Sequence, residues 1–251
     1  MKTAIIIILV ISIAGNMVGA YLLYKALKLR EEVRLFQKYH SDLLEKYEAA
    51  KADFAGIDTF AKDNNKLLRE TTSEERKKMT VFFGASITKN WDLERYFSGK
   101  QLLNRGIGSQ TDMQLLARFS ADVLEFAPGR VVIKFCSGNF QPKTDIEMVW
   151  NEFEMMALMA QRRNIEPILA TVIPVTRKAP ELPDFNTTKQ IQEFNRRLKR
   201  FGTEYRFLVV DYFTALADKD GYLPDDMARD PIHPNEKGYE IMAQVLRPIL
   251  K

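Results

Sequence analysis

Residues 80–88 read Thr80-Val-Phe-Phe-Gly-Ala-Ser-Ile-Thr88, and this stretch decides the fold that we expect. The apolar run at 80–83 predicts a buried strand, and Gly84 and Ala85 remove side-chain bulk where that strand ends. A turn at this point places the next side chain, Ser86, at the carboxyl edge of a parallel sheet, where open α/β folds bind their ligands. Ser86 is therefore a candidate nucleophile if a histidine reaches it. The alternative is that Ser86 caps the following helix.

Short strands alternate with helices along the rest of the chain. The predicted strands lie at residues 80–84, 101–104, 131–136, 168–173 and 207–210, and the predicted helices at 112–126, 148–162, 189–201 and 235–246. This alternation predicts an α/β fold of three layers, α/β/α, with a five-stranded parallel sheet. Right-handed crossovers then bring the carboxyl ends of all the strands to one edge.

Four segments of the chain meet at that predicted edge. Besides Ser86, they supply Gly108 and Ser109 after the second strand, residues 137–139 (Ser-Gly-Asn) after the third, and residues 230–234 (Asp-Pro-Ile-His-Pro) before the last helix. A serine, a histidine and an aspartate, beside small-residue turns with accessible backbone N–H groups, are the groups that acyl transfer needs.

Composition narrows the classes of function. The chain has 251 residues, of which 46% are hydrophobic, enough for one good-sized domain with an appendage or for two small domains. The net charge of +4 is small and spread along the chain, so we expect no nucleic-acid partner. The single cysteine, Cys136, lies in an apolar run and is interpreted as a core residue, and the two histidines, His40 and His233, are far apart. We therefore expect no disulfide and no metal site.

Residues 4–24 form an apolar stretch without a charged side chain. A helix of this length crosses a bilayer core of about 30 Å. A secretory signal, cut after the small residues at 18–20, is the alternative. Because the apolar run is long for a signal and no break follows it, we favour an uncleaved single-pass anchor.

Two features of the sequence give opposite predictions for the side of the membrane on which the catalytic domain lies. The basic residues Lys25, Lys28, Arg30 and Arg34 follow the span, whereas only Lys2 precedes it. The positive-inside rule then places the bulk of the chain in the cytoplasm. Short anchors of exported enzymes often have a sparse basic N-terminus of this kind, and on that ground we expect an extracytoplasmic catalytic domain.

A heptad pattern follows the span. Apolar or borderline residues alternate in steps of four and three at positions 22, 26, 29, 33, 36, 40, 43, 47, 50 and 54. This seam predicts a helix that either forms a homodimer through residues 22–57 or folds back on its own catalytic domain. The charged residues at 62–79 are interpreted as a solvated, partly helical connector. The expected organisation is an anchor at 1–24, a coiled-coil-like helix at 25–61, a connector at 62–79 and a catalytic domain at 80–251.

Four sequence blocks carry a family resemblance. They are Gly84-Ala-Ser-Ile-Thr88, Asn104-Arg-Gly-Ile-Gly-Ser-Gln-Thr111, Gly138-Asn139 and Asp230-Pro-Ile-His233, and Asn235-Glu-Lys-Gly-Tyr-Glu240 follows the last of them. On these blocks the chain from Thr80 to Ile249 resembles the SGNH hydrolases, also called the GDSL esterase/lipase family. It is most similar to the branch of lysophospholipase-like and platelet-activating-factor acetylhydrolase-like enzymes, which implies the flavodoxin-like SGNH hydrolase fold. Each block alone is a weak signal, whereas four in family order are specific.

The resemblance implies a role for each block. Ser86 is then the nucleophile, His233 the base that takes its proton, and Asp230 the group that orients the histidine. The implied oxyanion hole consists of the backbone N–H of Ser86, a backbone N–H of the second block at Gly108 or Ser109, and the side-chain amide of Asn139.

Two residues depart from the family pattern. Ala85 stands where the first block commonly has aspartate, and Ser109 aligns with the usual oxyanion glycine. That aspartate is neither nucleophile nor base, so we expect the chemistry to survive with altered hydrogen bonding in the loop. Ser109 keeps its backbone N–H, but its side chain narrows the pocket and its backbone has less freedom.

We therefore expect a membrane-anchored serine esterase that hydrolyses an ester of a lipid, an acylated sugar or a small acyl compound through an acyl-enzyme on Ser86. The loop at 174–186, after the fourth strand, is expected to line the pocket. The mechanism needs no metal or organic cofactor. The alternative is a non-catalytic envelope or scaffold protein that uses the same fold to bind a glycan or a protein partner.

Overall fold

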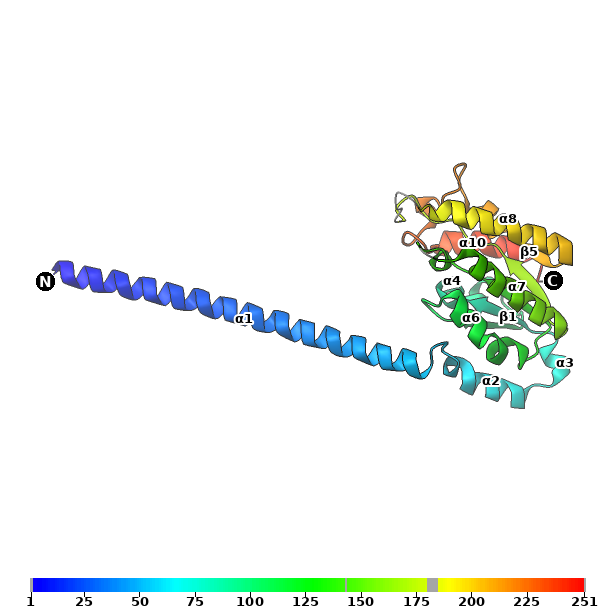
Figure 1. The fold of residues 1–251 in the computed structure, drawn as a ribbon, viewed down its shortest axis with the longest axis horizontal. Coiled ribbons are helices and arrows are strands. Elements are labelled where there is room, and N and C mark those ends of the chain that lie inside the picture. Colours follow the sequence, from blue (N-terminus) through cyan, green and yellow to red (C-terminus); the bar gives the residue numbers. More distant parts are fainter. Residues whose placement is uncertain (1, 143, 180–184, 251) are drawn as a thin grey trace. The chain divides into compact units, whose positions relative to one another are not determined.

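The computed structural model describes residues 2–142, 144–179 and 185–250. The chain forms two compact units, Met1–Ala52 and Asp53–Lys251. The first unit is a single helix, α1 (Lys2–Ala52), and the second holds a sheet with helices on both faces (Figure 1).

The sheet of the second unit has five parallel strands in the order β2-β1-β3-β4-β5. The strands are β1 (Thr80–Gly84), β2 (Leu102–Gly106), β3 (Arg130–Lys134), β4 (Glu166–Ala170) and β5 (Leu208–Val210). All five residues of β1 are buried, as its apolar run predicted. The predicted five-stranded parallel sheet is confirmed, with strand ends displaced by up to three residues because pairing with the neighbouring strand, rather than the apolar run itself, sets each end.

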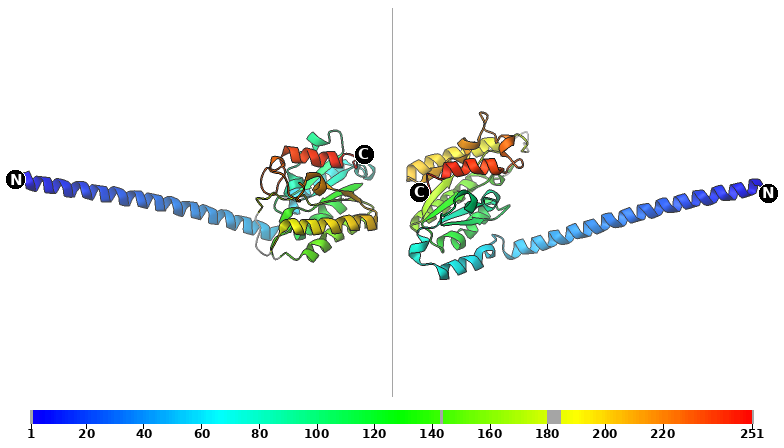
Figure 2. Two further views of the ribbon diagram at one scale, coloured as in Figure 1. Left: turned by 90° about the horizontal axis from the view of Figure 1, so that it is seen from above. Right: turned by 180° about the vertical axis from the view of Figure 1, so that it is seen from behind.

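Two layers of helices enclose the sheet, so the predicted three-layer α/β/α arrangement is confirmed (Figure 2). One apolar core lies beneath α6 (Asp112–Phe119), α7 (Ile146–Arg162) and α8 (Thr187–Tyr205), with a π-helical turn, η1 (Ser120–Leu124), directly after α6. The other core lies beneath α4 (Ser86–Lys89), α5 (Leu93–Tyr96), α9 (Tyr212–Leu216) and α10 (Glu236–Leu246). Side chains alternate between these cores along β1, with Val81 and Phe83 facing one and Phe82 the other.

Helix α1 continues without interruption through the predicted span and the heptad seam. Of its described seam residues, Leu22, Leu29 and Phe36 are exposed within this chain. Among the residues whose side chains are described, no helix has the length and apolar character needed to cross a bilayer. The side chains of residues 4–14, which make up half of the predicted span, lie outside the described residues. The anchor and the homodimer through residues 22–57 stay predictions of the sequence pattern.

The second unit begins before the sheet, with α2 (Asp58–Glu70) and α3 (Ser73–Arg76). Residue 61, where the sequence placed the end of one long helix, lies inside α2. The segment 62–79 was interpreted as solvated from its charges, yet Asn64 is buried and Leu67 and Leu68 pack against the larger core. The reason is that Asn64, Leu67 and Leu68, at positions i, i+3 and i+4, form one inward face of α2. The many charged residues around them make the segment look solvated in the sequence.

Candidate active site

Ser86 lies at the carboxyl end of β1, where the chain turns from strand to helix. Ala85 makes the turn, and Ser86 begins the short helix α4. A Cβ at Gly84 would lie 2.6 Å from the carbonyl oxygen of Lys134, so only glycine fits where β1 approaches β3 this closely. The turn directs the Ser86 hydroxyl to His233, with Oγ 2.8 Å from Nε2. The structure thus joins two residues that are 147 positions apart in the chain.

His233 and Asp230 face each other across one tight turn before α10. The Nδ1 atom of His233 lies 2.8 Å from Oδ1 and 2.9 Å from Oδ2 of Asp230. Because a carboxylate only accepts, Nδ1–H donates to Asp230 and the unprotonated Nε2 accepts from Ser86 Oγ–H. The backbone N–H groups of Ile232 and His233 also donate to Asp230 Oδ1, at 3.1 and 2.9 Å. These bonds fix the carboxylate so that it can hold the imidazole ring in one orientation.

The electrostatic setting of Asp230 keeps it charged. Partial burial acts to raise the pKa of Asp230, but the hydrogen bonds from the Ile232 amide and the His233 ring outweigh burial and hold that pKa below its usual value. Asp230 is thus an anion in the neutral range and stabilises a positive charge on His233 when the histidine takes a proton.

The predicted oxyanion residues lie on two further turns at the same edge of the sheet. Within the described part of the chain, the backbone N–H groups of Ser86 and Ser109 have no protein acceptor. Asn139 closes the short 3₁₀ turn η2 (Ser137–Asn139) after β3; its Oδ1 accepts from the Cys136 backbone N–H at 3.0 Å, and its Nδ2 donates to Asp112 Oδ1 at 3.4 Å. These contacts orient the Asn139 amide.

The two departures from the family pattern have distinct consequences. Ala85 is buried and stands at the N-cap of α4, where its methyl side chain has no oxygen to cap the helix. Ser109 has a φ angle of 62°, in the left-handed region that glycine adopts freely. A serine there costs on the order of 1 kcal/mol in backbone strain, which the surrounding loop must offset. The loop therefore holds Ser109 in a backbone conformation that glycine adopts freely, despite the serine Cβ.

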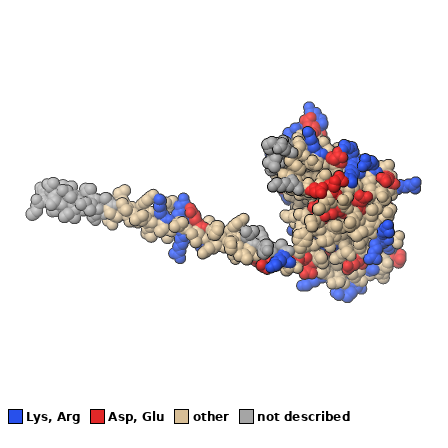
Figure 3. Space-filling model, in the orientation of Figure 1, with Lys and Arg blue, Asp and Glu red and all other residues tan. Residues whose placement is uncertain are grey.

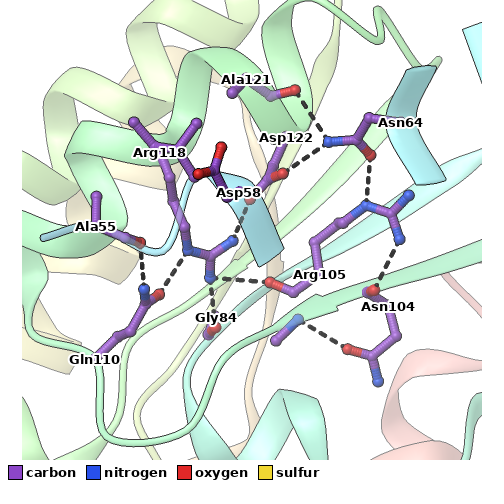
Figure 4. A network of polar contacts seen from close by, with 12 residues as sticks. Ala55, Asp58, Asn64, Gly84, Asn104, Arg105, Gln110, Arg118, Ala121 and Asp122 are labelled. Carbon is purple, nitrogen blue, oxygen red and sulfur yellow. Dashed lines mark hydrogen bonds and ion pairs between the residues drawn. The ribbon is translucent and has the colours of Figure 1, made fainter. Parts of the chain in front are cut away.

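Arg118, on α6, is a buried residue that the sequence reasoning missed, and it joins the two strands that lead into this site (Figure 4). Its Nη2 donates to the carbonyl oxygens of Gly84 at 3.0 Å and Arg105 at 2.9 Å, at the ends of β1 and β2. Its Nη1 pairs with Asp122 at 2.6 Å, and its Nε donates to Gln110, the neighbour of Ser109, at 2.5 Å. Burial lowers the pKa of Arg118, against the opposing effect of Asp122.

A second arginine extends the network to the residues before the sheet. Arg105 donates from Nε to Asn64 at 2.9 Å and pairs with Asp63 on α2 at 2.6 Å. Asn64 Nδ2 in turn donates to Asp122 at 2.8 Å, and Gln110 Nε2 donates to the Ala55 carbonyl at 2.6 Å (Figure 4). Residues 55–64 therefore belong to the framework of the site. The signal in the sequence was the spacing of Leu115, Arg118 and Asp122, which places charges on an apolar helix face.

Two cavities border the segments that carry these groups. One of about 220 Å³ adjoins Asp230 and includes part of the loop predicted to line the pocket; its lining residues are Thr176, Lys178, Asp225, Ala228, Arg229, Asp230 and Pro231. One of about 320 Å³ lies beside α4 and β2 and is lined by Thr59, Phe60, Lys89, Asn104, Gly106 and Ile107. Residues 180–184 of the predicted pocket loop lie outside the described residues.

The chemistry available at the site comes from side chains and backbone amides. In the described ranges, no group of three or more His, Cys, Asp or Glu side chains has the geometry to hold a metal ion. Cys136 is half-buried against the second apolar core, and burial raises the pKa of its thiol, so it stays protonated in the neutral range. Charges of both signs mix on the face of the second unit drawn in Figure 3.

A parallel α/β sheet with a hydrogen-bonded Ser–His–Asp array at its carboxyl edge defines a serine hydrolase. Residues 82–241 match the model of the GDSL-like lipase/acylhydrolase family. The chain belongs to this family and is an ester-hydrolysing enzyme of the SGNH type.

Solved structures agree with this assignment. The structure is similar to a GDSL-like lipase from Bacteroides thetaiotaomicron, with 25% identity, a TM-score of 0.69 and coverage of 79% of this chain and 98% of that chain. It is also similar to a Bacteroides fragilis protein assigned as an acylhydrolase, with 26% identity, a TM-score of 0.70 and coverage of 79% and 97%. The lipase/acylhydrolase from Enterococcus faecalis, at 21% identity, shares the fold, with a TM-score of 0.57 and coverage of 69% and 95%. No curated protein matches the chain.

Proposed function

We propose that the protein is a serine esterase that hydrolyses a carboxylic ester through an acyl-enzyme on Ser86. The observation that carries this proposal is the continuous hydrogen-bonded array from Ser86 Oγ through His233 to Asp230, with contacts of 2.8 to 2.9 Å. A serine hydroxyl is a weak nucleophile until an adjacent base can remove its proton, and this array supplies the base and its orienting carboxylate.

Each group in the array has one role in the reaction. Ser86 Oγ attacks the ester carbonyl carbon while His233 Nε2 takes the hydroxyl proton. The tetrahedral oxyanion accepts hydrogen bonds from the backbone N–H groups of Ser86 and of the second block, at Gly108 or Ser109, and from the Asn139 amide. Collapse of this intermediate breaks the bond to the alcohol, which leaves with the proton from His233. Water, deprotonated by His233, then releases the acid and restores Ser86.

The substrate is a carboxylic ester of a lipid, an acylated sugar or a small acyl compound. A GDSL-like lipase and an acetyl xylan esterase both occur among the structures that share this fold. Rates on esters of increasing acyl length, measured beside acetylated sugars, distinguish these classes.

Covalent labelling tests the nucleophile directly. A fluorophosphonate is expected to label the protein once, on the peptide that contains Ser86, because the probe captures only a serine that a neighbouring base activates. Digestion and mass spectrometry locate the label. Full ester turnover without labelling on Ser86 would show that another residue is the nucleophile.

We also propose that residues 4–24 anchor the enzyme in a membrane, with the catalytic unit on the extracytoplasmic side. The support is the apolar, uncharged stretch of the sequence, long enough for a bilayer core of about 30 Å. Protease added to intact cells is expected to digest the catalytic unit. Digestion only after the cells are opened would place that unit in the cytoplasm, as the basic residues after the span indicate.

A further inference from the structure

Asn139, the proposed side-chain donor to the oxyanion, is held by a neighbouring carboxyl group. Its Nδ2 atom contacts Asp112 Oδ1 at 3.4 Å, and Asp112 is the first residue of α6, directly after the second block. Glu152, on α7, interacts with the same carboxyl. Asp112 and Glu152 are each only 9% exposed. Two buried carboxyl groups therefore interact with each other next to Asn139.

One oxygen of Glu152 lacks a hydrogen bond that a shared proton would supply. The Glu152 Oε2 atom is buried and has no donor among the described residues. A carboxylate beside a second carboxylate is strongly disfavoured in a buried site, whereas one shared proton supplies the missing hydrogen bond and removes one of the two charges. The pair is then satisfied, and the Asp112 oxygen nearest Asn139 remains an acceptor.

We propose that the Asp112–Glu152 pair is the positioning element for Asn139, and that it holds the amide in place for the oxyanion when it carries one shared proton. This inference rests on the proposed function, because it assigns a role to the support of a donor in that mechanism. Asn139 Oδ1 is fixed by the Cys136 backbone N–H, so the Asp112 contact completes the orientation of the amide.

Ionisation of Glu152 is expected to weaken this support. Burial, together with the facing Asp112, raises the pKa of Glu152 to about 7. Below that pH, Glu152 donates to Asp112. Above it, two carboxylates repel each other and Asp112 moves from its contact with Asn139. Two titratable groups lie close by. The Cys136 thiol interacts with Asp112, and burial raises its pKa, which keeps it neutral across this range; Lys134 interacts with Cys136, and burial lowers the pKa of Lys134 to about 8 in the wild type and in Glu152→Gln alike.

The direction of the stability effect follows from linkage. The folded protein retains the Glu152 proton up to a pH of about 7, whereas the unfolded chain releases it near 4.5. The folded state binds more protons between these values, so its stability falls as the pH rises from about 4.5 to about 7 and then levels off. Glutamine at position 152 keeps a donor for Asp112 at every pH.

Glu152→Gln is the decisive variant. We expect kcat of the wild type on a p-nitrophenyl acetate substrate to fall by about tenfold, relative to Glu152→Gln, as the pH rises from 6 to 9, since a displaced donor loses part of its contribution to the transition state. KM is expected to change little. Glu154→Gln, a glutamate on the same helix that accepts from Trp150 at 2.7 Å, is the matched control and should follow the wild-type profile.

Two further measurements test whether the Asp112–Glu152 pair acts through Asn139. In an Asn139→Ala background, adding Glu152→Gln should no longer change the pH profile, because the pair then has no donor to position. The Tm of Glu152→Gln should rise above that of the wild type as the pH goes from 5 to 8, a readout that needs no catalysis. Parallel kcat profiles for the wild type and Glu152→Gln would overturn this inference alone. Absence of any ester hydrolysis by the wild type would overturn the proposed function and the inference with it.

Discussion

Replacing Ser86 with alanine is expected to lower kcat for a short-chain ester by about 10⁶-fold. The variant keeps the oxyanion donors and the His233–Asp230 pair, but it has no oxygen to form the acyl bond, so water must attack the ester directly. The group removed is a single hydroxyl, which is hydrogen-bonded to His233 Nε2 at 2.8 Å. The Tm is therefore expected to change little, and the loss is one of chemistry rather than of folding.

Adding a second substitution to Ser86→Ala tests whether Ser86 and His233 act together in catalysis or contribute independently. Ser86→Ala combined with His233→Ala is expected to be no slower than Ser86→Ala alone, because nucleophile and base act as a unit and the second loss has nothing left to remove. Steady-state rates with purified protein measure this. Ser98→Ala, at an exposed serine that contacts Glu94, is the control and should retain full activity. Retention of more than about 1% of wild-type kcat by Ser86→Ala would exclude Ser86 as the nucleophile.

The parts of this structure that could be predicted from sequence are those that local patterns specify. The apolar run of β1 and the small residues Gly84 and Ala85 predicted a strand and a turn, and the structure has both. The three-residue spacing of Asp230 and His233 fits one tight turn, and the two side chains meet there. In each case a few neighbouring residues determine the geometry, so a pattern of a few residues is enough to predict it.

The buried charges could not be predicted in the same way. The spacing of Arg118 and Asp122 places them on an apolar helix face, but the sequence does not show which distant segments bury them or Glu152. Arg118 donates to carbonyl oxygens of β1 and β2 besides pairing with Asp122, and Glu152 interacts with Asp112 on another helix. The same limit applies to α2, whose Asn64 meets Asp122 across 58 positions.

These buried charges explain why the site can tolerate its unusual residues. Ser109 holds a left-handed backbone conformation, and its neighbour Gln110 is fixed from both sides, by the Arg118 Nε and by the Ala55 carbonyl. A strained residue persists when its surroundings determine its conformation. The segment before the sheet therefore contributes to the geometry of the oxyanion loop, although no residue of that segment takes part in the proposed chemistry.

Replacing Arg118 with methionine is expected to destabilise the folded protein by about 3–5 kcal/mol. The guanidinium is fully buried over the Phe83 ring, 4.2 Å from its centroid, and its ion pair with Asp122 is buried on both sides. Methionine fills a similar volume but leaves the Asp122 carboxylate in the core without its cation, and it removes the guanidinium donor to the Gly84 and Arg105 carbonyls and to Gln110. Urea unfolding of the wild type and the variant measures the difference.

The loss of folding stability in Arg118→Met should come mainly from the Asp122 carboxylate, which is left buried without a cation, rather than from the loss of a favourable ion pair. Arg118→Met combined with Asp122→Leu is therefore expected to recover part of the stability, since an apolar pair in a core is often as stable as the ion pair it replaces. Lys66→Met, in the exposed Lys66–Glu70 pair with the same i, i+4 spacing, is the matched control and should cost less than about 1 kcal/mol. If Arg118→Met were as stable as Lys66→Met, the network would not be what holds the ends of β1 and β2 together, and the fixed position of Ser86 beside the oxyanion loop would have to come from the sheet alone.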